Sequence, residues 1–100
     1  MRYSVSSVML PVLVFAASGA FAYTGEKLEK TAKVKMPEAQ AIALKARPGQ
    51  IADRELEREA GGSGLRYSFD IKVKAVTYEV GVDAQTGKIL ENGREGKNPD

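Results

Sequence analysis

Two stretches in the second half of the chain alternate apolar and polar residues almost without interruption. They are LRYSFDIKV, residues 65–73, and VTYEVGVD, residues 76–83. Successive side chains of a β-strand point to opposite faces, so each stretch predicts a strand with one apolar face. Such strands are typical of an antiparallel sheet with one face covered and one in water. The residues expected on the covered face are Leu65, Tyr67, Phe69, Ile71 and Val73, then Val76, Tyr78, Val80 and Val82.

The stretch MPEAQAIALKARPGQ, residues 36–50, predicts the helix that covers this face. Pro37 suits the first helical position and Glu38 the first turn, while Pro48 and Gly49 stop the helix near Arg47. Small apolar residues recur at helical spacing, at Ala39, Ile42, Ala43 and Ala46. We therefore expect an α+β fold, with one main helix packed on a three- to four-stranded antiparallel sheet.

A first strand and a last strand complete the expected sheet. In IADRELEREA, residues 51–60, Leu56 is the main apolar residue, with Arg54 and Arg58 on its own face. A last strand is expected over residues 88–91. Together with the two alternating stretches, these segments make residues 36–91 one small domain.

Three connections are expected between the strands. GGSG, residues 61–64, is a flexible turn, and DAQTG, residues 83–87, is a tighter turn. In the second turn Asp83 and Thr86 can accept backbone N–H groups, and Gly87 supplies a positive φ. VKAV, residues 73–76, lacks the Gly or Asn of a tight hairpin, so this connection is expected to be irregular or slightly shifted in register.

The two ends of the chain are expected to lie outside the domain. Residues 1–22 have the layout of a signal peptide: Arg2 near the start, an apolar run over residues 8–17, and Ala20-Phe21-Ala22. The run is shorter than the about 20 residues of a spanning helix, so we expect export and cleavage after Ala22, the alternative being an uncleaved anchor. Residues 23–35 are a polar arm or a short helix over residues 26–32 with Thr24 as its cap, and residues 92–100 are a flexible tail.

Composition excludes several classes of function. The chain has no His and no Cys, so the usual zinc, copper and haem ligands are missing, as are an imidazole base and a thiol nucleophile. The net charge is +2, and it falls to +1 if Arg2 leaves with the signal peptide. Such a balance gives no reason to bind nucleic acid or an anionic membrane. We expect no enzyme, no cofactor and no metal site.

The polar face of the sheet is the candidate for partner binding. Asp53, Glu55, Glu57 and Glu59 would form a row with side chains about 6.6–7 Å apart. This row is a docking stripe for a basic partner, a weak divalent-cation site, or an ordinary solvated face; the last is favoured because a strand row does not converge on an ion. Pairing of Glu59 with Arg66 would place Leu56 beside Phe69. The candidate face consists of Glu55, Glu57, Glu59, Arg66, Asp70 and Glu79.

The order of PEAQAIALKARPGQI, ELERE, GLRYSFDI and TYEVGVDAQTGKIL resembles the PepSY domain, over roughly residues 36–90. That family is known from propeptides of thermolysin-type metallopeptidases and from small exported bacterial proteins. The resemblance implies a helix packed on an antiparallel sheet, and an exported protein that inhibits or modulates a peptidase. Its partner would be a peptidase or another exported protein, and no catalytic residue or oligomeric state is implied. The alternative is an exported ligand- or cation-sensing module without a peptidase partner.

Overall fold

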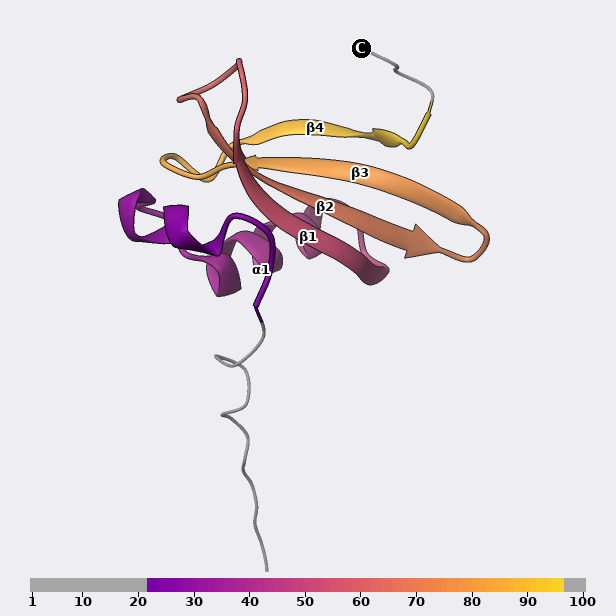
Figure 1. Ribbon diagram of the computed structural model, residues 1–100. Coiled ribbons are helices and arrows are strands. Elements are labelled where there is room, and N and C mark those ends of the chain that lie inside the picture. The colour runs from indigo at the N-terminus through magenta and orange to yellow at the C-terminus, as the bar shows by residue number, and fades with distance from the viewer. Residues whose placement is uncertain (1–21, 97–100) are drawn as a thin grey trace, which may run out of the picture.

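A computed structural model describes residues 22–96 of the chain (Figure 1). Its elements are the 3-10 helix η2 (Glu26–Thr31), the helix α1 (Met36–Ala46), and the strands β1 (Gln50–Arg58), β2 (Leu65–Val73), β3 (Val76–Asp83) and β4 (Ile89–Arg94). The strands form one antiparallel sheet in the order β1-β2-β3-β4, and both helices lie on the same side of it. The α+β prediction is confirmed.

The predicted signal peptide, residues 1–22, lies outside the described residues except for Ala22. Within residues 22–96, no helix is both long enough and apolar enough to cross a membrane.

The core lies between α1 and the apolar face of the sheet. Met36, Ala39 and Ala43 are the buried residues of the helix. The sheet contributes side chains that alternate along β1, β2 and β3, and those less than 2% exposed are Leu56, Tyr67, Phe69, Ile71, Val80 and Val82. Alanine at two of the three helix positions lets the helix approach the sheet closely. The predicted inward phase of the central strands is confirmed, with Val73, Val76 and Tyr78 only half-buried.

The polar arm is a folded part of the domain. The helix predicted over residues 26–32 is present as η2, but Thr24 does not cap it; Gly25 precedes it, with φ 87°. The Thr24 carbonyl instead accepts a hydrogen bond of 2.9 Å from the Leu56 backbone N–H, at the free edge of β1. Glu29 of η2 accepts a 2.8 Å hydrogen bond from the Met36 backbone N–H and another from the Tyr23 hydroxyl. Glu29 therefore caps α1 from a distance of seven residues.

The pairing of β1 with β2 differs from the expected register by two residues. Glu57, not Glu59, lies opposite Arg66, and Leu56 lies opposite Tyr67 rather than Phe69. The reason is the length of the turn: the Glu59 backbone N–H bonds to the Gly64 carbonyl, so the connection takes six residues instead of the four of GGSG. Because the shift is an even number, the side chains from Asp53 to Arg58 keep their expected faces. A bulge between Ile51 and Asp53 turns Ile51 to the helix side, opposite Ile71.

The connection at residues 73–76 is regular, contrary to expectation. Val73 pairs with Val76, and the β2–β3 register is unbroken. Lys74 adopts φ 59°, the left-handed conformation that Gly or Asn usually supplies in such a turn. The last strand is also longer than residues 88–91: it ends at Arg94, which pairs with Tyr78. Residues 92–94, assigned to the tail from the sequence, belong to the sheet.

Candidate functional site

The face of the sheet opposite α1 carries an open depression of about 450 Å³. The β1–β2 loop rises from this side of the sheet, away from the helices (Figure 1). The charged residues that line the depression are Asp53, Glu55, Glu57, Glu59, Arg66, Asp70, Glu79 and Glu91. All six residues that the sequence selected as a candidate face are among them. We call this depression the acidic trough.

Strand register explains the shape of the acidic trough. In one cross-strand row, Glu55 of β1 and Glu91 of β4 stand at the two margins, with Ser68 and Gly81 between them. The middle of this row has only small side chains, so its carboxylates form raised margins. In the next row Asp53, Asp70 and Glu79 lie directly opposite one another. Like charges in such positions repel, at a cost of about 0.2–1 kcal/mol per pair.

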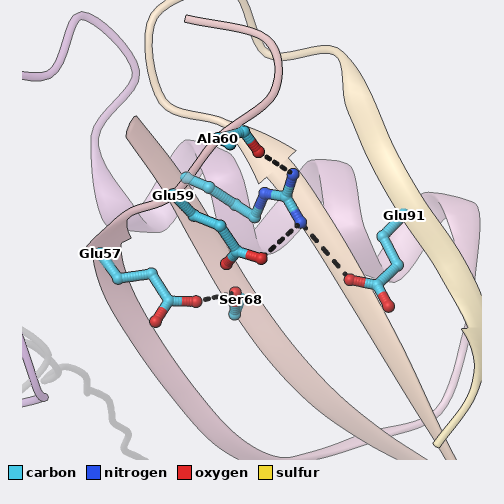
Figure 2. A network of polar contacts seen from close by, with 6 residues as sticks. Glu57, Glu59, Ala60, Ser68 and Glu91 are labelled. Atoms are coloured by element: carbon cyan, nitrogen blue, oxygen red, sulfur yellow. Dashed lines mark hydrogen bonds and ion pairs between the residues drawn. The ribbon is translucent and has the colours of Figure 1, made fainter. Parts of the chain in front are cut away.

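Arg66 fills one end of the acidic trough. Its Nη1 lies 3.5 Å from Glu91 Oε1 and 3.7 Å from Glu59 Oε2, and its Nη2 donates to the Ala60 carbonyl at 3.3 Å. Figure 2 shows Glu59 and Glu91 reaching toward the same guanidinium from opposite sides. Gly81 leaves room for it, because a Cβ at this position would lie 3.1 Å from Arg66 Cδ. Arg66 is 9% exposed, and it holds β4 and the β1–β2 loop to the middle of the sheet.

The other end of the acidic trough has no such cation. Carboxylate oxygens of Asp70 and Glu79, and of Glu95 just beyond the lining of the trough, lie within 4.8 Å of one another. Burial raises the pKa of Asp70, and the negative charges of Glu95 and Asp53 raise it further. Burial raises the pKa of Glu79 as well, and Glu91, Asp70 and Glu95 add to the shift. Across residues 22–96, the ion pairs are those of Arg66, so this group of carboxylates has no basic partner there.

Asp83 lies at the end of the sheet and is 1% exposed. Its carboxylate accepts hydrogen bonds from the backbone N–H groups of Gln85 and Thr86, at 2.8 and 3.2 Å, and two from Ser63. Burial alone would raise its pKa, but these hydrogen bonds outweigh burial and hold the pKa below its ordinary value. The turn role expected from the sequence for Asp83 is confirmed, as is the positive φ of Gly87, at 81°. Both carboxylate oxygens of Asp83 therefore accept hydrogen bonds within the fold.

Two serine–carboxylate contacts bear on catalysis. Ser68 Oγ donates to Glu57 Oε2 at 3.0 Å, on the open face (Figure 2), and Ser63 Oγ donates to Asp83 Oδ1 at 2.8 Å. The first contact is a cross-strand pair in water, and the second is one of four hydrogen bonds that hold Asp83. Neither contains the imidazole that takes the proton from serine in a catalytic triad, since the chain has no His.

Sequence reasoning missed Glu91 and Glu95, whereas the charge pair that it expected between Glu59 and Arg66 is present. The alternation of Glu91, Gly93 and Glu95 would have placed both carboxylates on the polar face, had the last strand been extended to Arg94. A second hollow, of about 890 Å³, lies between the arm, the start of α1 and β1. In this hollow the Arg54 guanidinium donates to Gln40 Oε1 at 2.8 Å and lies 5.7 Å from the centre of the Tyr23 ring. Arg54 therefore links the arm, α1 and β1 to one another.

Comparison with known proteins gives one match. The family model for the peptidase propeptide and YPEB domain, PepSY, matches residues 37–92, which is more than half of the chain. The match takes in α1, β1, β2, β3 and most of β4, and therefore every element that builds the acidic trough. No curated protein and no solved structure matches the chain.

Proposed function

Because this chain belongs to the PepSY family, we propose that it is an exported, non-catalytic module that binds a peptidase or another exported protein and modulates peptidase activity. The family match supports a peptidase-propeptide-like module. The acidic trough supports the choice of a macromolecular partner. It is an open, charged surface on the sheet, whereas small-molecule sites are concave and mostly apolar.

The surfaces that the fold leaves uncovered indicate where such a partner would bind. The apolar face of the sheet is covered by α1, and the edge of β1 at Leu56 is occupied by Thr24. The polar face and the outer edge of β4 are free of such cover within residues 22–96. A partner is therefore expected to contact the acidic trough, with or without backbone pairing along β4.

Export rests on residues 1–22, whose charge and apolar pattern is that of a signal peptide. Tyr23, the residue directly after the expected cleavage position, packs against the core of the domain. Fractionation of the producing cell, followed by N-terminal sequencing of the recovered protein, is expected to give Tyr23 as the first residue. Recovery of the chain inside the cell with residues 1–22 retained would contradict export.

The binding function is tested with the protein purified from the exported fraction and immobilised. We expect it to retain a peptidase or another exported protein, and the soluble form to change the rate of extracellular proteolysis. Glu38→Gln, a change on the exposed first turn of α1, serves as the control and should retain the same partner. Repeated failure to recover a partner, together with unchanged proteolysis, would show that the proposal is wrong.

The alternative is a cation-sensing module, and the proximity of Asp70, Glu79 and Glu95 favours it. Three carboxylates are fewer groups than the six to eight oxygen ligands that Ca²⁺ takes, although water can complete a site. A ligand that binds only the folded state raises the unfolding temperature. An increase with Ca²⁺ that Asp70→Asn abolishes would support sensing over protein binding.

A further inference from the structure

We propose that the acidic trough binds an extended basic segment of the partner, and that one Lys or Arg of this segment lies among Asp70, Glu79 and Glu95. This inference rests on the proposed binding function and names the chemistry of the partner at that site. It is carried by the contrast between the two ends of the trough.

The Arg66 end shows how this face holds a cation. A guanidinium that starts on β2 lies across β3 and meets carboxylates from the β1–β2 loop and from β4. It does so over Gly81, where the missing side chain leaves space. The surface can therefore hold a basic side chain flat against the sheet, between acidic margins.

The opposite end repeats this arrangement without the cation. Asp70 lies on the same strand and the same face as Arg66, four residues further along, with Glu79 opposite it on β3. Asp53 on β1 and Glu95 just after β4 take the places of the acidic margins. Lys72 is next on that face, but it makes no ion pair in the described part of the chain. Burial raises the pKa values of Asp70 and Glu79, and repulsion from the neighbouring carboxylates raises them further. A basic side chain from outside would remove that repulsion.

The charge balance makes the trough distinctive. Seven carboxylates and one guanidinium line it, a formal charge of −6, whereas the whole chain carries +2. More than half of the 13 acidic residues thus gather on one surface of a protein with a small net charge. Charge complementarity to a cationic partner follows, and an anionic partner would be repelled.

A segment with several cations fits the trough better than a single metal ion. Asp53, Glu55 and Glu57 stand along β1 at the spacing of alternate strand residues, about 6.6–7 Å, which is too far apart to converge on one ion. Alternate residues of an extended peptide have the same spacing. A peptide that lies parallel to β1 can therefore bring one cation to each carboxylate of that margin while another reaches Asp70.

The test uses the protein purified from the exported fraction and a nine-residue peptide that alternates Lys and Thr, matched to the nine residues of β1. Binding is followed by fluorescence anisotropy of the labelled peptide, with a Glu-for-Lys peptide as control. We expect only the Lys peptide to bind, and its affinity to fall as salt rises from about 50 to about 300 mM.

Asp70→Asn and Glu79→Gln should each weaken binding about threefold or more, as expected for loss of a charge contact near 0.7 kcal/mol. Glu38→Gln, which removes the same charge from α1, should leave the affinity unchanged.

Three results would overturn the inference. They are equal binding of the two peptides, unchanged affinity in Asp70→Asn and Glu79→Gln, or displacement of the Lys peptide by Ca²⁺ at micromolar concentration. Capture of an exported partner that these two variants retain fully would also overturn it, while leaving the proposed function intact. Conversely, specific binding of the Lys peptide that both variants weaken supports the inference even if proteolysis is unchanged and the peptidase proposal fails.

Discussion

Ser63 donates two hydrogen bonds to the carboxylate of Asp83, one from its backbone N–H to Oδ2 at 2.6 Å and one from its hydroxyl to Oδ1 at 2.8 Å. These bonds join the β1–β2 loop to the turn between β3 and β4. The loop is thereby held at one end of the acidic trough, where Arg66 also bonds to the carbonyl of Ala60. One buried carboxylate thus links two turns that are distant in the sequence.

Asp83→Asn is expected to lower the free energy of unfolding at pH 7 by about 2 kcal/mol, because an amide cannot accept from all the donors that the carboxylate serves. The folded-state pKa of Asp83 lies below its ordinary value of 3.8, so its contribution is complete above pH 3.8 and is lost as the pH falls through the folded-state pKa. Urea denaturation should show the difference between wild type and variant shrinking below about pH 3.8. A difference that stays constant with pH would contradict this account.

Asp70→Asn is expected to stabilise the isolated protein at pH 7. The folded-state pKa of Asp70 is raised, so its ionisation opposes folding: the penalty is absent below the unfolded value of 3.8 and grows as the pH rises through the folded-state pKa. Asp53 and Glu79 face Asp70 directly across the sheet, so a gain of about 0.2–1 kcal/mol is expected. Calorimetry should show a higher unfolding temperature at pH 7 and no gain near pH 3. A lower unfolding temperature at pH 7 would show that Asp70 is stabilising.

Tyr67→Phe is expected to cost about 1–2 kcal/mol of stability. The Tyr67 hydroxyl is buried and donates to the Val34 carbonyl at 2.6 Å, which ties the segment before α1 to β2. Burial and the nearby charge of Glu29 raise the pKa of Tyr67, so it stays protonated and able to donate. Tyr78→Phe is the matched control, because the ring of Tyr78 lies under Arg47 and phenylalanine keeps that ring. Equal urea midpoints for the two variants would contradict the role of the Val34 bond.

Gly25→Ala is expected to detach the arm from β1. Gly25 has φ 87°, and a Cβ there would overlap the Leu56 carbonyl oxygen. Strain of this kind costs about 1–3 kcal/mol and would be relieved by breaking the bond between Thr24 and Leu56. Hydrogen exchange at the Leu56 amide should therefore accelerate. Gly93→Ala, where a Cβ meets open space, should leave that rate unchanged.

Local patterns predicted the strands and their faces. Tyr67, Phe69 and Val80 were assigned to the core from period-two alternation alone, because the face of a strand residue depends only on its parity. The six candidate residues came together on one surface for the same reason. Helix α1 was found within one residue at each end from Pro37 and Pro48.

What the sequence did not predict depends on contacts between distant segments. The β1–β2 register depends on how many residues the loop takes, and GGSG alone suggested four instead of six. The capping of α1 by Glu29 and the bonds from Ser63 to Asp83 arise only once the segments have packed. The position of Arg66 along β2 predicted a side chain exposed on the polar face. Arg66 is instead buried, because the β1–β2 loop and Glu91 close around it.

Concentrating carboxylates in the acidic trough also polarises the molecule as a whole. The trough carries −6, whereas Arg47 and Arg54 lie on the helix side of the sheet. Such an electric dipole exerts a torque on the protein in the field of any charged body that it approaches. A cationic partner would meet a domain already turned with its sheet toward it, so the dipole acts on the rate of encounter before any contact forms.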